Sequence, residues 1–529
     1  MSGSEMIAIL EDLAPLAPAG VVLLTSLAVV FLSLVLKPHQ RQALRWVTLS
    51  GLVLALAALA IGCLAGAAGG TPAPFAETAP GGSLGPARLQ GAFVVDGFGM
   101  AVTLLALLSG IYSVLATPTQ ADDSPLASGE YHGLLLLAVA GMVFLGMAHD
   151  LVTLAVSLEV LVLSSMVLAG AQREREASSE AALKYLVLSA FSTAFLLFGM
   201  AFFFGATGRL GLEAVQLPVG DRRAWLALAG LGLILAGTFF KVGAVPFHFW
   251  VPDVYQGAPT PVSVLLAVGV KAAAFAVVAR ILFGAFCAPD LAARWLPLVM
   301  AASVITMVVG NLVAMQQNNV KRLLAYSAIA HAGYLLLGFL VAPAGLAPAV
   351  REAHLGGVAF YLLAYGVATA GAFAVTGLAR ADGRPLEEIR DYAGLSRERP
   401  GLALCMAAFM LSLAGLPPLA GFFAKFVIFR GAVAQGFVVP AVLGVLASVA
   451  SLYYYLRVIL AMYMAAEPEP RLAPCRAGAS ARALIYGAGL ATLALGLAPP
   501  RLLPEKTPDH QPPVALRKVA VHDTPPTPP

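Results

Sequence analysis

The sequence predicts an all-α polytopic membrane protein with about fourteen transmembrane helices. Of its 529 residues, 60% are hydrophobic and only 11% are charged, less than half of the roughly 25% charged residues of an average soluble domain. The mean hydropathy is +0.86. Much of the chain falls into apolar runs of about 20 residues, the length that crosses a bilayer core about 30 Å thick.

The same composition excludes several other classes of protein. A soluble enzyme or a disordered scaffold would carry more charge, and an outer-membrane barrel would alternate in polarity over segments of about 10 residues. A net charge of +4 is too small to indicate a nucleic-acid partner. We expect the lipid bilayer as the surroundings of most of the chain.

The sequence offers no cofactor site of its own. The four cysteines are far apart and form no C-x-x-C pair, which argues against an iron–sulfur cluster or a structural zinc held by this chain alone; they are Cys63, Cys287, Cys405 and Cys475. The sequence contains neither the G-x-G-x-x-G dinucleotide motif nor the P-loop motif. We therefore expect no metal and no cofactor in this chain.

The first three spans form a predicted N-terminal group over residues 1–130. The first apolar run follows Glu5, Glu11 and Asp12 rather than a basic stretch, so we expect a retained helix and not a cleaved signal peptide. A loop rich in glycine, proline and alanine occupies residues 67–90. The apolar runs around it predict helices at about 15–36, 44–66 and 93–115.

Two groups of five helices follow, over residues 131–285 and 295–464. The first group is expected at about 131–147, 151–170, 183–206, 224–250 and 258–285. The second group is expected at about 295–315, 321–341, 354–379, 401–431 and 436–464. A loop and a fourteenth helix at about 482–498 make up residues 465–498. The remaining residues, 499–529, are rich in proline and are predicted to be disordered.

The distribution of basic residues predicts the orientation. Cytoplasmic loops carry an excess of lysine and arginine. With fourteen spans and the N-terminus outside, the inner loops hold more of these residues than the outer segments do. Arg209, Arg222 and Arg223 argue against this assignment, but both termini on the periplasmic side fit the whole sequence better.

Four lysines lie inside predicted spans, whereas arginine lies mostly in loops. An ionisable residue inside a span costs about 2.5–3.5 kcal/mol on insertion scales and is by default a functional hypothesis. Burial can bring the pKa of a lysine close to neutrality, so a buried lysine can load and release a proton, which arginine cannot. The alternative is that the side chain reaches the membrane surface, an alternative that is strongest at the start of a helix. The four residues are Lys184, Lys241, Lys271 and Lys425.

An acid and two histidines join these lysines as candidates. Glu159 lies in the middle of its apolar span, where a lysine partner would let it stay charged; a static ion pair is the alternative. His331 lies deep in an apolar run and could relay a proton at physiological pH, or serve only as a hydrogen-bonded packing residue. His248 and Asp253 are accessory candidates, like Lys184, and for His248 a structural role is an equal possibility.

Two spans carry helix-breaking prolines beside their lysines. Pro246 follows Lys241 by five residues, and Pro417 and Pro418 precede Lys425. Proline inside a helix frees backbone carbonyls, which membranes tolerate only where protein or a hydrated cavity satisfies them. The two interrupted spans, the seventh and the twelfth, are five spans apart. This spacing is expected if helices 4–8 and 9–13 are inverted repeats of a transporter-like fold.

Three stretches resemble a known family. They are FKVGAVPFHFWVPDVYQGAPTPVSVLLAVGVKAAAF from Phe240, NNVKRLLAYSAIAHAGYLLLG from Asn318 and LAGLPPLAGFFAKF from Leu413. They closely resemble the antiporter-like subunits of bacterial NADH:quinone oxidoreductase, complex I, and of these subunit N. The resemblance covers about residues 93–465, and its motifs occur in the family's order.

The resemblance implies both an architecture and a row of functional residues. It implies fourteen helices with two inverted five-helix repeats and broken helices 7 and 12. It implies that Glu159 pairs with Lys241, that Lys271 and His331 continue a central hydrated axis, and that Lys425 ends it. Ala328 stands where the family often has a second serine in the tenth helix, so a hydroxyl contribution is not expected there.

The function that the resemblance implies is proton translocation within an enzyme complex. Electrons would pass from NADH through FMN and iron–sulfur clusters to quinone in partner subunits, and other membrane-arm subunits would be the partners of this chain in the bacterial inner membrane. A cation/proton antiporter subunit and a membrane subunit of a hydrogenase-type complex are the alternatives. The D-V-Y-x-G-A-P motif favours the first interpretation.

Overall fold

The computed structural model describes most of the chain. It describes residues 14–37, 40–68, 87–88, 91–117, 125–213, 215, 221–343, 347–378, 380–381, 384–464 and 479–498. The predicted proline-rich tail, residues 499–529, lies outside these ranges, and so does most of the predicted loop 67–90.

The described residues form helices almost throughout. The N-terminal part and the first group of helices are α2 (Ala17–Val35), α3 (Gln42–Ala68), α4 (Gly97–Ala116), α5 (Gly129–Met147), α6 (Leu151–Ala169), α7 (Glu176–Thr207), α8 (Arg222–Val242), α9 (Trp250–Gly257), α10 (Thr260–Leu265), η4 (Leu266–Val270), α11 (Lys271–Arg280) and η5 (Ile281–Ala285). The second group and the last helix are α12 (Pro289–Ala314), α13 (Val320–Leu337), α14 (Pro348–Leu378), α15 (Leu395–Glu398), α16 (Pro400–Ala414), α17 (Ala420–Ala434), α18 (Val438–Met464) and α19 (Ala479–Leu497).

Short elements make up the rest of the regular structure. They are the 3-10 turns η1 (Ala14–Leu16), η3 (Pro125–Ala127) and η7 (Ile389–Tyr392), and the strands β1 (Ala87–Arg88), β2 (Phe93–Val94), β3 (Arg380–Ala381) and β4 (Arg384–Pro385). The strands pair as two antiparallel ladders, β1 with β2 and β3 with β4. Each of these strands is only two residues long, and helices make up nearly all the regular structure of the described residues. The prediction of an all-α architecture is therefore confirmed.

Twelve helices of the described chain are long and apolar enough to cross a membrane. The exact count of fourteen spans stays a prediction, because α13 and the short α16 and α17 do not meet this criterion by themselves. Several helices begin earlier than predicted: α7 begins at Glu176 rather than near 183, and α12 at Pro289 rather than near 295. Their first turns are polar, so hydropathy alone did not include them.

Both predicted helix breaks are present, and each begins at a glycine. Helix α8 ends before Gly243, which has φ +75°, and α16 ends before Gly415, which has φ +88°. A left-handed residue stops a helix, and glycine adopts that conformation without steric cost. The chain resumes as α9 after Pro246 and as α17 after Pro418. Each break therefore begins a few residues before the prolines that predicted it.

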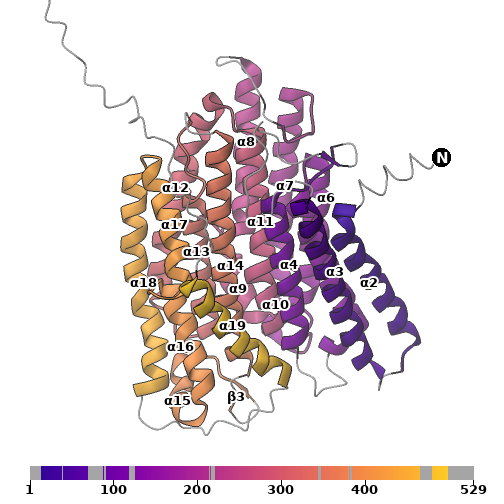
Figure 1. Cartoon of the computed structure of the whole chain (residues 1–529), viewed down its shortest axis with the longest axis vertical. Helices are drawn as coiled ribbons and strands as arrows, with labels where there is room; N and C mark the ends of the chain where they lie inside the picture. The colour runs from indigo at the N-terminus through magenta and orange to yellow at the C-terminus, as the bar shows by residue number, and fades with distance from the viewer. Residues whose placement is uncertain are drawn as a thin grey trace, which may run out of the picture.

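The centre of the bundle is the continuous helical segment from α10 to η5, residues 260–285. Its apolar window is fully buried, and that of α14 is 89% buried. Neighbouring helices stand side by side from α2 and α3 at one edge to α18 at the other, while α19 runs obliquely across α4, α14, α16 and α17 (Figure 1). The π-helical turn η4 directly precedes Lys271. Such π-bulges are rare in proteins as a whole, and those that occur are often at functional sites.

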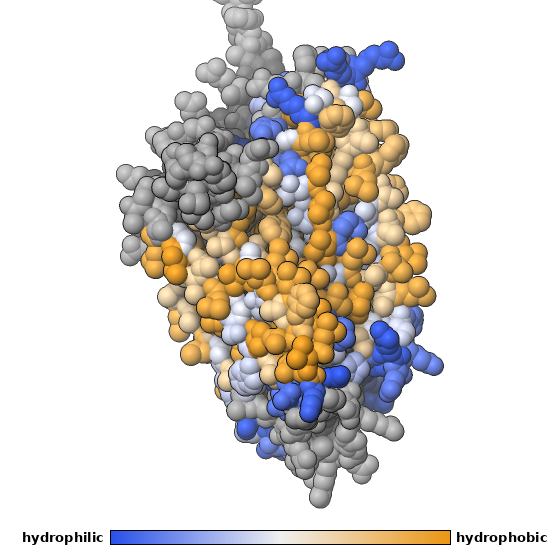
Figure 2. Space-filling model, turned by 90° about the vertical axis from the view of Figure 1, so that its right-hand side faces the viewer, coloured by the Kyte–Doolittle hydropathy of each residue, from blue (hydrophilic) through white to orange (hydrophobic). Residues whose placement is uncertain are grey.

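The outer surface matches a membrane environment. Large apolar side chains are exposed on the outer helices, among them Phe31, Leu64, Phe191, Val449 and Leu490. On the face seen in Figure 2, hydrophobic residues cover the middle of the molecule and hydrophilic residues gather toward its two ends. The aqueous boundary of the protein therefore lies at the helix ends.

Candidate functional site

Four of the five predicted central residues lie inside the protein. The side chains are only 3–5% exposed for Lys241, Lys271, His331 and Lys425, whereas Glu159 on α6 is half-buried. They come from α8, α11, α13 and α17 and lie on the buried faces of these helices. A buried charge that cannot reach the membrane surface is costly. The alternative explanation, a lysine side chain that extends to the membrane surface, therefore does not apply to these three lysines.

Glu159 and Lys241 are near each other without forming a direct ion pair. Glu159 Oε1 accepts a hydrogen bond of 2.7 Å from Thr193 Oγ1 on α7. Lys241 Nζ lies 5.3 Å from the centre of the Phe240 ring and has no hydrogen-bond partner in the described part of the chain. The two charges still interact across the gap between them. This is an open arrangement of the predicted pair, in which Thr193 holds the acid.

Lys271 lies at the first position after the π-helical turn. Its Nζ donates to the backbone carbonyl of Ala328 at 2.5 Å and lies 5.2 Å from the centre of the Tyr365 ring. A backbone carbonyl can accept a hydrogen bond without any side-chain hydroxyl. The carbonyl of Ala328 therefore provides an acceptor at the position where the serine hydroxyl is absent.

His331 is surrounded by tyrosines. Its Nδ1 lies 2.7 Å from the hydroxyl of Tyr361, and its Nε2 lies 3.3 Å from the hydroxyl of Tyr455. The ring centres of His331 and Tyr365 are 4.9 Å apart, and the hydroxyls of Tyr455 and Ser327 are 2.5 Å apart. A histidine with hydrogen-bonding groups on both nitrogens can take up a proton on one side and release it on the other.

Lys425 uses the carbonyls that the second helix break exposes. Its Nζ donates to the carbonyls of Leu413 and Ala414, at 2.9 and 3.0 Å, and to Ser448 Oγ at 2.8 Å. The last carbonyls of a helix have no partner within that helix. At the break after α16, the freed carbonyls are therefore satisfied by an ionisable group. At the break after α8, the Phe240 carbonyl is satisfied by Trp250 Nε1 instead.

Polar contacts connect His331 to Lys425. The series starts at Tyr455, which lies beside His331, and the ring centres of Tyr455 and Tyr454 are 4.3 Å apart. The Tyr454 hydroxyl donates to Asn311 Oδ1 at 3.0 Å. Asn311 Nδ2 in turn donates to the Tyr334 hydroxyl at 3.0 Å. The Tyr334 ring centre lies 5.0 Å from Lys425 Nζ. Between Lys241 and Lys271, by contrast, the described side chains form no such series of hydrogen bonds.

The accessory candidates lie apart from this row. Lys184 Nζ is 2.7 Å from Asp253 Oδ2 and also 2.7 Å from Glu180, and Arg322 lies 2.6 Å from Asp253 Oδ1. The Lys184 side chain is 41% exposed, so it reaches the surface. His248 lies in the turn between α8 and α9, and its Nδ1 has no hydrogen-bond partner in the described part of the chain.

Several residues of the site were missed from the sequence. The tyrosines around His331 were one group, although Tyr361 and Tyr365 are four residues apart on an apolar helix and therefore share a face. Thr193 was another. The largest omission was Arg280, which is 2% exposed and forms a bidentate ion pair with Asp96. Arg280 Nη2 donates to Asp96 Oδ1 at 2.9 Å and to the Gly146 carbonyl at 2.8 Å.

The Asp96–Arg280 pair also acts on its surroundings. It lies near His149, in the short connection between α5 and α6. Burial lowers the pKa of His149 below its usual value and the positive charge of Arg280 lowers it further, while the carboxylates of Glu213, Asp96 and Asp150 oppose part of this shift. His149 is therefore favoured in its neutral form in the folded protein.

The chain is similar to membrane subunits of respiratory enzymes. Residues 148–451 match the family described as NADH:quinone oxidoreductase/Mrp antiporter, TM. NADH-quinone oxidoreductase subunit N of Trichlorobacter lovleyi is 44% identical over 373 residues, which are 70% of this chain and 74% of that protein. Subunit N of Mycobacterium tuberculosis is 40% identical over 390 residues, 73% of this chain and 72% of that protein.

Solved structures show the same fold. A chain of respiratory complex I from Thermus thermophilus with bound aureothin is 36% identical, with a TM-score of 0.74 and coverage of 91% of this chain and 97% of that one. A chain of the Mrp complex from Dietzia sp. has a TM-score of 0.73 at 22% identity, covering 92% and 95% of the two chains. At that identity the second likeness concerns the fold alone.

Proposed function

The chain belongs to the family of NADH-quinone oxidoreductase subunit N, and we propose that Glu159, Lys241, Lys271, His331 and Lys425 carry protons through it. The chain is a proton-translocating membrane subunit of complex I, and other membrane-arm subunits are its partners. The antiporter and hydrogenase-type alternatives are not favoured, because the relatives from Trichlorobacter lovleyi and Mycobacterium tuberculosis, at 44% and 40% identity, are both named subunit N.

The observation that supports the proposed row is its burial. Three lysines and a histidine that are 3–5% exposed would be unfavourable in a passive spacer, because each charge loses hydration without gaining a carboxylate within ion-pair distance among the described residues. A group that must lose and regain a proton at each turnover fits such a place better than a permanent charge does.

The contacts support an order of transfer. When Glu159 lies close to Lys241, the attraction between them favours the protonated lysine. When the pair is open, as it is where Thr193 holds Glu159, Lys241 is freer to release its proton toward Lys271. From there Tyr365, His331 and the other tyrosines supply hydroxyl and imidazole groups that can both donate and accept, and Lys425 ends the row.

The redox chemistry of the complex lies elsewhere in this proposal. NADH, FMN, iron–sulfur clusters and quinone are assigned to partner subunits. Among the described residues, no group of three or more histidine, cysteine, aspartate or glutamate side chains could hold a metal ion. The contribution of this chain is to bind, hold and move protons at the nitrogen and oxygen atoms named above.

The arrangement in the membrane is part of the proposal. We divide the chain into helices 1–3 (1–130), a first repeat (131–285), a second, inverted repeat (295–464), a loop with the last helix (465–498) and a proline-rich tail (499–529). We place it in the bacterial inner membrane with both termini on the periplasmic side. The excess of arginine and lysine in the inner loops supports this orientation.

Two lysines provide a matched test of the row. Lys271→Met should lower NADH-driven proton uptake into proteoliposomes by about 100-fold, the scale on which removal of one acid–base group acts. Lys184→Met removes the same group from a surface ion pair and should leave proton uptake close to wild type. Equal uptake by both variants, in complexes assembled to the same extent, would contradict the proposed row.

A further inference from the structure

A small backbone ladder joins three connections at one end of the bundle. Isolated antiparallel bridges pair Phe93 with Ala148 and Asp150 with Gly211. His149 lies between the two bridges, on the middle segment of the ladder. The ladder therefore ties the start of α6 both to the segment before α4 and to the segment that follows α7.

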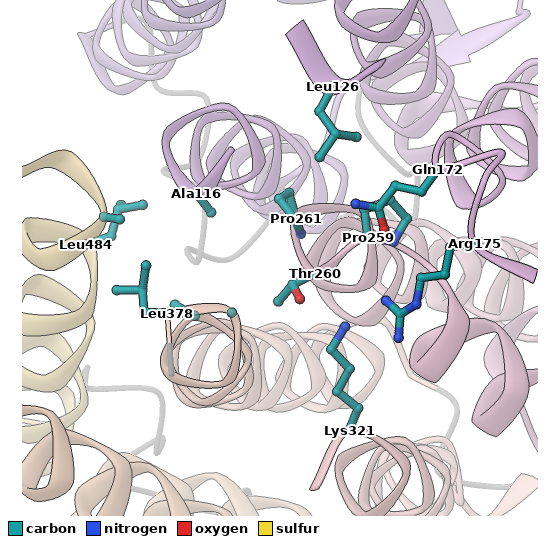
Figure 3. Close-up of a pocket in the computed structure, with 13 residues that line it drawn as sticks. Ala116, Leu126, Gln172, Arg175, Pro259, Thr260, Pro261, Lys321, Leu378 and Leu484 are labelled. Carbon is teal, nitrogen blue, oxygen red and sulfur yellow. The ribbon is translucent and has the colours of Figure 1, made fainter. Parts of the chain in front are cut away.

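This end of the bundle is the one that the proposed orientation places on the periplasmic side. Helix α4 begins here, capped by Asp96, and crosses to the opposite end, where its last residue, Ala116, lines the pocket drawn in Figure 3. Helix α6 also begins at the ladder, and α5 and α7 end beside it. The ladder therefore lies next to the water that receives translocated protons.

The imidazole of His149 lies between the interior and the surface at this ladder. The residue is 7% exposed, and its Nδ1 has no hydrogen-bond partner in the described part of the chain. Its Nε2 lies 3.8 Å from Oε1 of Glu213, whose side chain is 61% exposed. The Glu213 carboxylate lies over Gly211, where an added Cβ would overlap with it. A separation of 3.8 Å is too long for a hydrogen bond, so the two side chains face each other without being closed together.

Four charged groups act on His149, and three of them are already engaged. Arg280 on α11 holds the Asp96 carboxylate, and Asp150 Oδ1 accepts from two amides at the start of α6, both at 2.8 Å. The exposed carboxylate of Glu213 is the one that can move toward the imidazole. Burial and the charge of Arg280 lower the pKa of His149, against the partial opposition of the three carboxylates. His149 is therefore neutral at neutral pH and takes up a proton on the acidic side of its usual pKa of about 6.5.

The helices that the ladder joins carry the first part of the proton-carrying row. Glu159 lies on α6, and Thr193, which donates to it at 2.7 Å, lies on α7. The proposed transfer requires Glu159 to leave Thr193 and to approach Lys241. A contact that ties the start of α6 more firmly to the end of α7 would restrain this movement.

We propose that His149 and Glu213 form a latch that slows proton translocation when the water on the periplasmic side becomes acidic. A protonated imidazole attracts the Glu213 carboxylate, and the closed ion pair holds the α5–α6 connection against the α7–α8 connection. Loss of the proton opens the latch again. The proposal rests on the proposed row and orientation, because the latch acts on proton transfer through Glu159. Translocation would thus slow as its own product accumulates.

The test varies the pH inside proteoliposomes that contain the assembled complex with its NADH site outside. The initial rate of NADH oxidation is measured with the lumen at about pH 7.5 and at about pH 5.5, on the two sides of the range in which histidine titrates. The external pH is constant, and valinomycin with potassium removes the membrane potential. Relative to His149→Gln, the wild type should slow by about threefold more in the acidic lumen, the change that a partly exposed ion pair can supply. The pH gradient itself opposes both proteins equally.

Two further variants and a matched control complete the test. Glu213→Gln should lose the additional slowing as His149→Gln does, and so should Gly211→Ala, which displaces the Glu213 carboxylate without changing a charge and serves if the histidine variant fails to assemble. Asp221→Asn removes a carboxylate from the same connection, and asparagine can still cap α8, so this control should slow as the wild type does. Equal slowing of the wild type, His149→Gln and Glu213→Gln would overturn the proposal, and so would loss of the slowing in the control.

Failure of the latch and failure of the row give different results. If Lys271→Met lowers proton uptake while His149→Gln slows as the wild type does, the latch is wrong and the row stands. If Lys271→Met translocates protons normally, the row is wrong. An additional slowing that disappears in both His149→Gln and Glu213→Gln would then still support the latch, acting by another route.

Discussion

The lysines of the two helix breaks have different partners. Lys425 donates to two backbone carbonyls and a serine, whereas Lys241 has no hydrogen-bond partner within the described chain. Apart from burial, which has the larger effect, the group that acts on Lys241 is the carboxylate of Glu159. Beyond burial, the state of Lys241 therefore depends on one carboxylate, and that of Lys425 on fixed dipoles. The protonation of Lys241 should therefore be easier to alter by mutation than that of Lys425, because a side chain can be replaced and a backbone carbonyl cannot.

The first residue-scale prediction concerns that control. Glu159→Gln should lower proton uptake more than Glu159→Asp does, because the charge matters more than the volume. Thr193→Val should change uptake less than Glu159→Gln, since it removes one hydrogen bond, worth about 1 kcal/mol, and keeps the carboxylate. Proton uptake and NADH oxidation are measured together in proteoliposomes. Equal uptake by all four proteins would leave Glu159 as a packing residue.

The sequence made some residues of the site predictable and others not. The lysines stood out because a charge in an apolar run is exceptional. Tyr334, Tyr361 and Tyr455 did not, because tyrosine is common in apolar helices and only its three-dimensional position brings its hydroxyl to His331 or Asn311. Arg280 was missed for a related reason: its partner, Asp96, is distant in the sequence. Proximity of that kind comes from tertiary packing.

At the scale of elements, the two breaks depend on glycine. Prolines indicated their approximate positions, but α8 and α16 stop at Gly243 and Gly415. The sequence alone did not single out these two glycines, because the chain contains 52 and, of those that the structure describes, only a few adopt positive φ. The helices themselves were predicted well, since an apolar run of about 20 residues is the length of a membrane-spanning helix and is rare elsewhere. Polar first turns, as in α7, were not recognised.

A matched pair of glycines tests the second break. Gly415 and Gly436 both have φ +88°, so alanine at either should cost about 1–2 kcal/mol of backbone strain. At Gly415 the new Cβ would also lie 2.9 Å from Lys425 Cδ, whereas at Gly436 nothing lies within 4 Å. Gly415→Ala should therefore lower proton uptake more than Gly436→Ala does. A similar loss in the two variants would show that Lys425 is not sensitive to its position at the break.

At the scale of the whole molecule, a buried ion pair joins the start of α4 to α11. Asp96 caps the start of α4 by accepting from the Gly99 amide at 2.7 Å, and Arg280 on α11 also holds the carbonyl at the end of α5. The pair thus connects three helices at one end of the bundle. Its two members are 5% and 2% exposed.

Breaking this pair should destabilise the subunit. Arg280→Gln leaves a buried carboxylate without its partner, which costs about 3–5 kcal/mol. Adding Asp96→Asn should recover part of the loss, because asparagine removes the charge and can still cap α4. The thermal stability of the complex in detergent is the measurement. If the single and double variants melt at the wild-type temperature, the pair does not hold these helices together.

The central claim is that the lysine at the first helix break moves protons by losing and regaining its own proton. The most direct measurement is the number of protons translocated per NADH oxidised in proteoliposomes, for the wild type, Lys241→Ala and Lys241→Arg, at equal assembly of the complex. Both variants should translocate far fewer protons, and Lys241→Arg should fail as Lys241→Ala does, because arginine keeps its charge but cannot release its proton. Wild-type translocation by Lys241→Arg would show that a fixed positive charge is sufficient there and would contradict the account.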